Sequence, residues 1–171
     1  MNKVERQAQK ERCLTAERLR EKFHYSNETG VFTHRIGARS RKIAGRLSGA
    51  GYRQLIIDGR YYYAHRLAWL YVTGKWPKLQ IDHIDLDKTN NRFENLREAN
   101  RIQNQGNRTR NANNKVGAKG VRWNRSARRW QARITSAGKD IHLGYFDSIA
   151  DAKEAYRQAA NHKFGKYART A

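Results

Sequence analysis

The spacing of apolar and polar positions divides the N-terminal half of the chain into short strands and helices. A short helix is predicted after Thr15, which can cap it. The stretches SNETGVFTHR and GRLSGAGYRQLIIDGRYYYAH then read as strands, and Asp58-Gly59 predicts a hairpin turn because both turn positions need positive φ. A longer helix follows and ends at Gly74 and Pro77. Its apolar face consists of Ala64, Leu67, Ala68, Tyr71 and Val72.

A strand, a loop, a strand and a helix are predicted next, in that order. LQIDH predicts a short strand, IDLDKTNNRFE a polar loop and NLREA a second strand. The segment RIQNQ predicts a helix that Asn100 caps, with Gln103 at the third helical position reaching back to the cap. The whole element is therefore a compact strand–strand–helix unit.

The last part of the chain predicts a separate sheet and helix. GVRWN, RRWQARIT and DIHLGYF indicate three strands, and SIADAKEAYRQAANHKFG indicates a helix that Ser148 and Asp151 cap and Gly165 ends. Strand alternation places seven residues under this helix: Val121, Trp123, Trp130, Ala132, Ile134, Ile141 and Leu143. The opposite face carries Arg122, Asn124, Arg129, Gln131, Arg133 and His142.

That opposite face consists of cations and amides, which donate hydrogen bonds to phosphates and to base edges. A sheet with such a face can enter the major groove of DNA, and a plain solvent-facing sheet is the alternative. The predicted fold class is α+β, with a strand-rich N-terminal region followed by a small three-stranded antiparallel sheet packed on one helix. The predicted segments are a polar tail (1–14), a first domain (15–107), a basic linker (108–116) and a second domain (117–171).

Charge narrows the class of partner. Among 171 residues, 36 are Lys or Arg and 15 are Asp or Glu, a formal net charge of +21 that favours nucleic acid or an anionic membrane surface. No apolar run approaches the roughly 20 residues of a membrane span. Asp and Glu are absent from residues 99–139, which hold eleven Lys or Arg. Contact with nucleic acid explains this stretch better than a solubility face, because phosphates compensate the repulsion.

The N-terminus and the cysteine content indicate an intracellular, reducing compartment. No apolar signal core follows Met1, so secretion is not expected. The single cysteine, Cys13, excludes an internal disulfide and a Cys-cluster zinc site. We expect a cytoplasmic protein with double-stranded DNA as its partner. No membrane association and no obligate protein partner are expected, and the chain is expected to be a monomer.

The strand–strand–helix element also holds the candidate chemistry. Phosphodiester hydrolysis needs a base that activates water, a divalent cation and a means of positioning the phosphate. Asp82 and His83 are adjacent at the end of the first strand, Asn95 begins the second, and Asn104 lies on the helix. Mg²⁺ prefers hard oxygen ligands such as carboxylates and amides. A histidine alone could be structural, but the set of four favours catalysis.

The segment IDHIDLDKTNNRFENLREANRIQNQ resembles the HNH endonucleases with a ββα-metal finger, especially phage and intron-encoded homing endonucleases. The resemblance implies that His83 is the general base, that Asp82 and Asn104 bind the metal, and that Asn95 holds the backbone and orientation of the base. Asn104 stands where the family name has His. An amide oxygen suits Mg²⁺, or Mn²⁺, better than zinc or nickel.

Several neighbouring residues have no assigned role in the site. Asp85 and Asp87 are interpreted as loop-turn residues. His65 could contact phosphate, cap the helix or pack in the core. Arg66, Arg92 and Arg97 could hold the scissile strand or lie on the surface.

Residues 117–167 resemble the APETALA/ethylene-response-factor type DNA-binding domain through KGVRWN, RRWQARI, HLGYFDSIADAKEAYRQAA and KFG. That family reads DNA through its sheet, which implies contacts by Arg122, Arg129, Gln131 and Arg133. Together the two resemblances imply a site-specific homing-type endonuclease, using one divalent metal ion to nick DNA or to break both strands. A phage-encoded protein would act in the host cytoplasm. A DNA-binding regulator without catalysis and an RNA-binding protein are the competing hypotheses.

Overall fold

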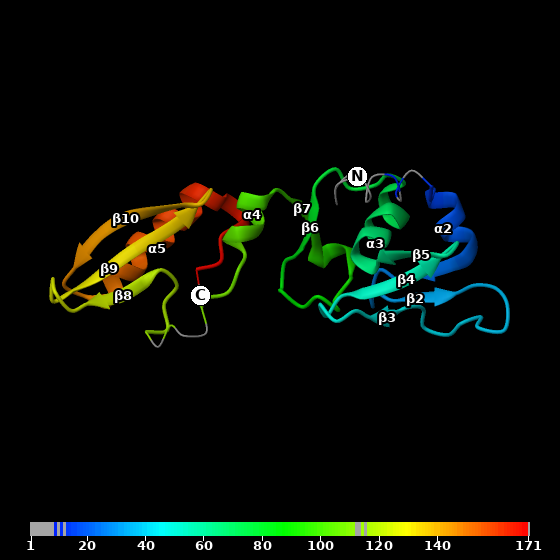
Figure 1. Ribbon diagram of the computed structural model, residues 1–171, viewed down its shortest axis with the longest axis horizontal. Coiled ribbons are helices and arrows are strands. Elements are labelled where there is room, and N and C mark those ends of the chain that lie inside the picture. Colours follow the sequence, from blue (N-terminus) through cyan, green and yellow to red (C-terminus); the bar gives the residue numbers. More distant parts are fainter. Residues whose placement is uncertain (1–8, 10, 12, 112–113, 115, 171) are drawn as a thin grey trace. The chain divides into compact units, whose positions relative to one another are not determined.

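The protein has an α+β fold, as predicted, built as two compact units. The computed structural model describes residues 9, 11, 13–111, 114 and 116–170. The units comprise Met1–Glu98 and Ala99–Ala171. Both contain small antiparallel sheets packed on helices (Figure 1). The predicted limits at residues 14, 107 and 116 stay a prediction.

The first unit begins with a capped helix and five short strands. The Thr15 side chain accepts a hydrogen bond from the backbone N–H of Arg18, as a helix cap does. Asp58 and Gly59 both have positive φ, 47° and 76°, which confirms the predicted hairpin turn. The elements are α2 (Ala16–Lys22), β1 (Phe23–Tyr25), β2 (Phe32–His34), β3 (Arg46–Leu47), β4 (Arg53–Ile57), β5 (Arg60–Tyr63) and α3 (Ala64–Thr73).

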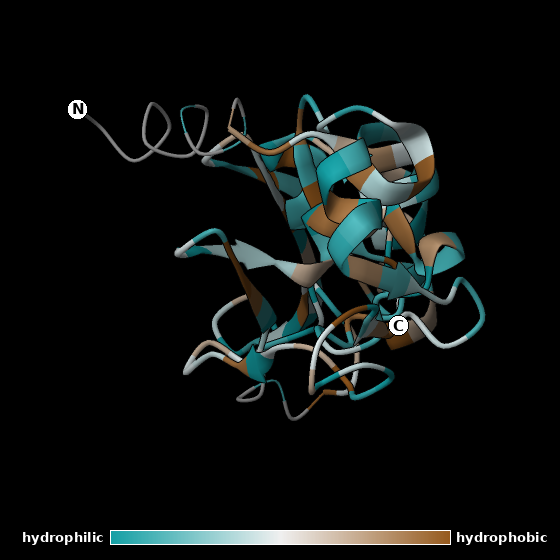
Figure 2. Cartoon of the chain, turned by 90° about the vertical axis from the view of Figure 1, so that its right-hand side faces the viewer, coloured by the Kyte–Doolittle hydropathy of each residue, from teal (hydrophilic) through white to brown (hydrophobic). Residues whose placement is uncertain are grey.

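The hairpin register separates a buried face of the β3–β4–β5 sheet from an exposed one. Leu55 pairs with Tyr62, and both are buried. Ile56 pairs with Tyr61, and both are exposed. The buried face meets α3, whose Leu67, Ala68 and Leu70 belong to the same core. Val72, predicted on the apolar face of this helix, is instead 37% exposed near its end. Figure 2 colours the chain by hydropathy. Helix α3 ends at Gly74 in the left-handed conformation, with φ of 74°, as predicted.

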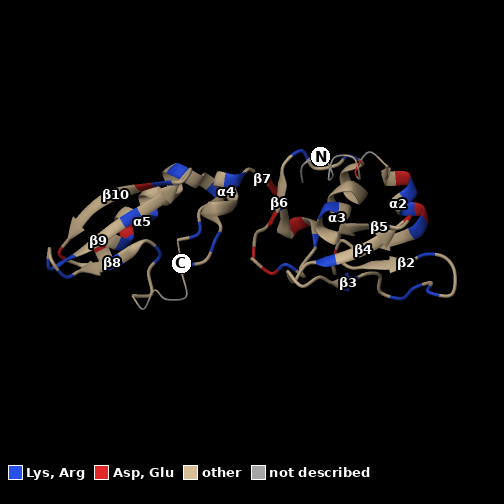
Figure 3. Ribbon diagram, viewed as in Figure 1, with Lys and Arg blue, Asp and Glu red and all other residues tan. Residues whose placement is uncertain are grey.

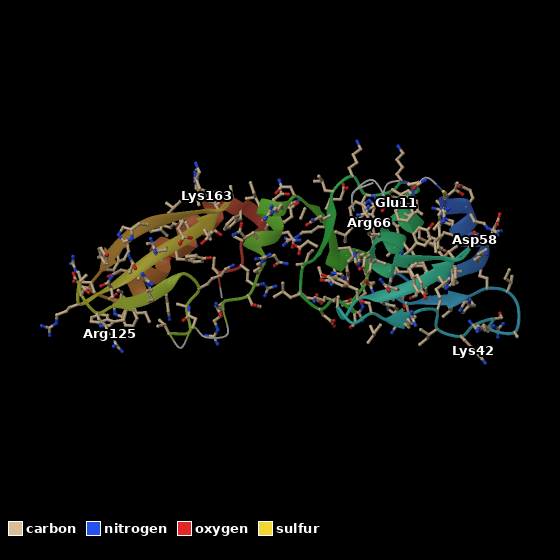
Figure 4. All side chains as sticks on the ribbon, in the orientation of Figure 1. Glu11, Lys42, Asp58, Arg66, Arg125 and Lys163 are labelled. Atoms are coloured by element: carbon tan, nitrogen blue, oxygen red, sulfur yellow. The ribbon has the colours of Figure 1, made fainter. Side chains whose placement is uncertain are left out.

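The start of the described chain is fastened to this core. Leu14 is only 3% exposed, and its carbonyl oxygen accepts a hydrogen bond from Nε1 of Trp76 at 3.0 Å. Arg66 pairs with Glu11 at 2.7 Å, and the two side chains lie together in Figure 4. Arg66 also donates to the backbone oxygens of Leu79 and Pro77. Arg66 therefore ties structural segments together.

The strands of the strand–strand–helix element form a two-stranded sheet. The sheet consists of β6 (Gln80–His83) and β7 (Leu96–Ala99). The element also contains the short helix η1 (Phe93–Asn95) and the helix α4 (Arg101–Gly106). Asn100 accepts from the backbone of Gln103, and the Gln103 side chain accepts from the backbone of Asn100. This capping box confirms the predicted start of the helix. Helix α4 belongs to the second unit.

The second unit has one three-stranded antiparallel sheet with a helix on one face. Its elements are β8 (Val121–Asn124), β9 (Arg129–Ser136), β10 (Lys139–Phe146), α5 (Ile149–Phe164) and η2 (Gly165–Tyr167). The order is β10-β9-β8, and α5 buries Val121, Ala132 and Ile134 beneath it. Ser148 caps α5 by accepting from the backbone N–H of Asp151, and Gly165 ends it, as predicted.

The prediction that Trp123 packs in this core is wrong. Its side chain is 45% exposed, so it does not pack under α5 as alternation suggested. Strand β8 lies at the edge of the sheet, where a neighbouring strand covers only one side. The ring leans on Trp130 in an edge-to-face contact, with centroids 5.2 Å apart. The alternation of residues along β8 predicted the correct face of the sheet for Trp123. It could not show how much of that face α5 covers.

Helix α4 is built into the second unit. A Cβ added at Gly106 would lie 2.6 Å from Cγ of Phe164, so only glycine allows this close approach. Nζ of Lys119 donates to the backbone oxygens of Gly106 and Arg108 at 2.9 and 2.7 Å. The end of α4, and with it the position of Asn104 in this unit, is thus fixed by packing against α5 and by Lys119. No described helix is long and apolar enough to cross a membrane.

Candidate active site

His83 lies at the end of β6 and is only 5% exposed. Its Nε2 atom lies 3.2 Å from Oδ1 of Asn91, a buried residue that was not among the predicted site residues. Nδ2 of Asn91 donates to the backbone oxygen of Thr89 at 3.0 Å, which fixes the orientation of the amide. Because Oδ1 can only accept, the proton of the neutral imidazole belongs on Nε2, and the basic atom of the ring is Nδ1.

The environment of His83 favours the neutral ring. Burial lowers the pKa of the imidazole below its usual value, although the Asn91 contact and the charges of Asp85 and Asp82 oppose the shift. A neutral imidazole near pH 7 can accept a proton from water, which is the property a general base needs.

Asn95 holds the loop that follows His83. Its Nδ2 donates to Oδ1 of Asp85 at 2.9 Å and to the backbone oxygen of Asn90 at 2.8 Å. Its Oδ1 accepts from the backbone N–H of Asp85 at 3.0 Å. Its backbone oxygen accepts from the N–H of Ile84, the residue next to His83. The side chain is 8% exposed, so these bonds are sheltered from water.

Asp85 and Asp87 organise the turns of the same loop, as the sequence indicated. Asp85 accepts from the backbone N–H of Asp87 and from Nδ2 of Asn90. Asp87 accepts from the backbone and hydroxyl of Thr89. These are local turn contacts that shape the backbone between β6 and η1.

Asp82 is buried beside a guanidinium. Its carboxylate is 5% exposed, and Oδ2 accepts from Nε and Nη2 of Arg97, both at 2.9 Å. Arg97 lies on β7, so the two strands of the finger present this pair to each other. The sequence left the role of Arg97 open, and in the structure this residue pairs with Asp82. Asp82, His83 and Asn95 all lie in the first unit. Asp82 and His83 end β6, whereas Asn95, predicted to begin the second strand, is the last residue of η1.

His65 packs against the ring of His83. It lies in the first turn of α3, is 8% exposed, and meets His83 edge-to-face with centroids 5.2 Å apart. Tyr63 stacks on it at 5.4 Å, and Tyr52 lies 5.2 Å away. Among the described residues, none forms a hydrogen bond with its buried Nδ1 atom. Burial lowers the pKa of His65 to about 3, so the ring is neutral and acts in packing.

Asn104 lies on α4 and is described with the second unit. Its backbone N–H donates to the carbonyl of Asn100 at 2.9 Å, within the first turn of the helix. The described residues contain no group of three or more His, Cys, Asp or Glu side chains that could hold a metal ion.

The sheet of the second unit presents the predicted polar face. Gln131 lies at its centre and is only 5% exposed. Nε of Arg122 donates to its Oε1 at 2.9 Å, and its Nε2 lies 3.3 Å from Nδ1 of His142. Tyr145 joins this group because a bulge between His142 and Gly144 shifts the alternation of β10. Tyr145 was not predicted on this face, because the bulge reverses the side that alternation gives it.

Two of the predicted contact residues form ion pairs at the ends of that face. Arg129 donates from Nε and Nη2 to the two carboxylate oxygens of Asp147, both at 2.7 Å. Arg133 lies 3.9 Å from Asp140. Asn124 accepts from the backbone of Ala127 and so shapes the β8–β9 turn. Lys and Arg are spread over both units, with fewer acidic residues in the second (Figure 3).

Comparison with known proteins agrees with this geometry. A family model described as HNH endonuclease matches residues 62–105, which run from within β5 to within α4. The strand–strand–helix element with Asp82, His83 and Asn95 is therefore an HNH endonuclease domain.

A particular relative is also found. The chain is 31% identical over 94 residues to Protein 3.8 of Escherichia phage T7, an alignment that covers 54% of this chain and 78% of the phage protein. The chain belongs to the family of this phage protein. No solved structure matches the chain. The resemblance of residues 117–167 to the APETALA/ethylene-response-factor type DNA-binding domain stays a prediction, because the matched family model ends at residue 105.

Proposed function

We propose that this protein is a site-specific DNA endonuclease of the phage homing type, with His83 as general base and one divalent metal ion as cofactor. The observation that carries the proposal is the setting of His83. Its buried ring has Nε2 directed at Asn91, and its loop is held by the side chain of Asn95. A histidine that only filled a core would need neither a fixed tautomer nor a braced loop.

The proposed reaction is hydrolysis of one phosphodiester bond. Nδ1 of His83 accepts a proton from water, and the water oxygen forms a bond to phosphorus. The bond between phosphorus and the 3′ oxygen breaks, and the leaving oxygen takes a proton from solvent. The products carry a 5′-phosphate and a 3′-hydroxyl. Asn95 acts as a positioning residue, because it holds the backbone next to His83 rather than touching the substrate.

Asp82 and Asn104 are the proposed metal ligands. One carboxylate oxygen and one amide oxygen are hard donors, and Mg²⁺ is commonly bound by one or two protein ligands with water and phosphate completing its shell. The donor set therefore fits Mg²⁺ best and Mn²⁺ second. When bound, the ion would offset negative charge on the scissile phosphate and on the leaving oxygen. Arg97 orients the Asp82 carboxylate through its two hydrogen bonds to Oδ2.

We propose that the second unit is a DNA-binding domain. Its sheet face would contact duplex DNA through the six predicted residues: Arg122, Asn124, Arg129, Gln131, Arg133 and His142. Gln131 is covered by its neighbours, so it would act mainly by holding Arg122 and His142 in place. We propose that the chain acts as a monomer on DNA in the cytoplasm of a host cell.

End analysis of the products tests this proposal. Purified protein is incubated with supercoiled plasmid and Mg²⁺, and the nicked product is treated with DNA ligase. We expect nicked circles that ligase reseals directly, because resealing needs a 5′-phosphate next to a 3′-hydroxyl. Asp82→Ala and Asn104→Ala should both abolish nicking, while Asp87→Ala, a turn residue, should keep it. Nicking by both ligand variants at the wild-type rate would reject the metal assignment.

A further inference from the structure

The exposed face of the β3–β4–β5 sheet runs directly into the candidate active site. We call it the outer face. It consists of the side chains on the side opposite the core: Arg46, Tyr52, Gln54, Ile56, Tyr61 and Tyr63. The ring of Tyr52, one residue before β4, lies 6.0 Å from the ring of His83 and 5.5 Å from that of Tyr63. The surface therefore starts beside the proposed catalytic histidine and continues along the strands.

Apolar side chains on this face are exposed side by side. Ile56 is 53% exposed and Tyr61 42%, and the two are direct cross-strand partners. A single exposed apolar residue is ordinary, but a contiguous group on a sheet is typical of a binding surface.

Cations flank the same aromatic rings. The guanidinium of Arg46 lies over the ring of Tyr61 at 5.3 Å and donates to its hydroxyl at 3.1 Å. Nζ of Lys88 lies 5.0 Å from the ring of Tyr52 and donates to the backbone oxygen of Ala50. Each cation is thus held in place beside a tyrosine, which reduces the entropy cost of ordering it against an anion.

The sequence that leads into and forms β3 and β4 carries cations but no acidic residue. Residues 29–57 hold six Lys or Arg and no Asp or Glu. Lys42, on the loop between β2 and β3, extends outward in the same part of the first unit (Figure 4). A second copy of this surface would place cations against cations, so charge argues against a symmetric dimer. A polyanion with apolar sugar edges matches both the charge and the exposed rings.

We propose that the outer face binds the sugar–phosphate backbone of duplex DNA immediately beside the scissile bond. Arg46 and Lys88 contact phosphates, and Tyr61 and Ile56 pack on deoxyribose. The inference rests on the proposed function, because it adds a contact to the same DNA that His83 would cut. It assigns a role to the part of the first unit that precedes the matched HNH segment.

The test is the salt dependence of DNA binding, measured by fluorescence anisotropy with the full chain in chelator. The variant is Arg46→Gln with Lys88→Gln. Removing one phosphate contact should lower the slope of log K against log salt by about 0.9, so the double variant should bind with a slope lower by about 1.8. The matched control is Lys75→Gln with Lys78→Gln, two exposed cations in the segment that follows α3, beside Trp76, which stacks on the buried ring of Tyr62. The control variant should keep most of the wild-type slope of log K against log salt.

A second readout locates the contact. Hydroxyl-radical footprinting of wild type should show protection adjoining the cut position, and the double variant should lose this protection while the control keeps it. Equal slopes and equal footprints for both pairs would overturn the proposal. A dimer in sedimentation that Ile56→Ser dissociates would overturn it too, in favour of a second copy. Binding is measured in chelator and does not require cleavage. A protein that failed to cut DNA would therefore contradict the proposed function, but the binding of DNA by the outer face could still be tested.

Discussion

Oδ1 of Asn91 lies 3.2 Å from Nε2 of His83, and the amide of Asn91 cannot turn without losing its bond to the backbone of Thr89. This relationship selects one tautomer of the imidazole. It makes Asn91 a positioning residue for the proposed base, in the way that an outer partner orients a metal-bound or catalytic histidine in other sites.

Asn91→Ala should slow plasmid nicking by about 10- to 100-fold, the range typical for loss of such a partner. The loss should fall on kcat rather than on KM, because Asn91 does not touch DNA in this account. Asn91→Asp keeps an acceptor opposite Nε2 and should recover part of the rate. If Ala and Asp variants were equally slow, the residue would serve only the fold of the loop.

Asn95→Ala should weaken the loop between β6 and η1. The change removes two donated hydrogen bonds and one accepted bond in a buried place, and a buried donor or acceptor left unpaired costs about 1–3 kcal/mol. Urea unfolding should show this loss of stability, and nicking should fall with it. Asn161→Ala, an exposed position on α5, is the control and should change neither. Wild-type stability and activity in Asn95→Ala would refute the bracing role.

His65 should make the first unit less stable in acid. The folded pKa is about 3, because burial and the neighbouring His83 and Arg66 disfavour the charged ring, whereas an unfolded histidine titrates near 6.5. The unfolded chain therefore binds the proton first, and the free energy of unfolding falls as pH drops below about 6.5. Tyr52 and Tyr63 also pack on the ring.

The measurement for His65 is urea unfolding of wild type and His65→Phe at pH 8 and pH 5. For a single group with these two pKa values, the free energy of unfolding of the wild type should fall by about 2 kcal/mol between pH 8 and pH 5. The phenylalanine variant keeps the aromatic packing without the titrating nitrogen, so its loss should be smaller by about that amount. An unchanged pH dependence would mean that His65 is protonated in the folded protein without penalty.

The sheet of the second unit should contribute to DNA affinity through Arg122 and Arg133. Replacing both with Gln should reduce the salt slope of binding by about 1.8, because two phosphate contacts are removed. Lys153→Gln with Lys163→Gln removes the same charge from exposed positions on α5, the helix that covers the other face of the sheet. That control should bind nearly as wild type does. Equal effects of the two pairs would indicate a general charge attraction rather than a binding face.

Local features of the fold could be predicted because their physics lies within a few residues. The Asp58-Gly59 turn, the Asn100–Gln103 capping box and the Gly74 stop each depend on backbone angles or caps that particular residue types favour. The predicted positions of Asp82 and His83 at the end of a strand followed from the same local pattern.

Features that depend on distant contacts could not be predicted. Tyr52 meets His83 across 31 positions of the chain, and Asn91 meets it through a loop whose shape the turn residues set. Trp123 was wrongly assigned to the core because alternation gives a side and not the extent of the covering helix. Tyr145 was missed because the β10 bulge shifts the register by one residue.

The most direct test of the account is nicking of supercoiled plasmid by His83→Ala in Mg²⁺, beside wild type with and without chelator. We expect wild type to nick in Mg²⁺ and to stop in chelator, and His83→Ala to bind the plasmid but leave it supercoiled. Undiminished nicking by His83→Ala, or nicking that survives chelation, would contradict the account. Tight binding by wild type without cleavage in Mg²⁺ or Mn²⁺ would identify a DNA-binding regulator instead.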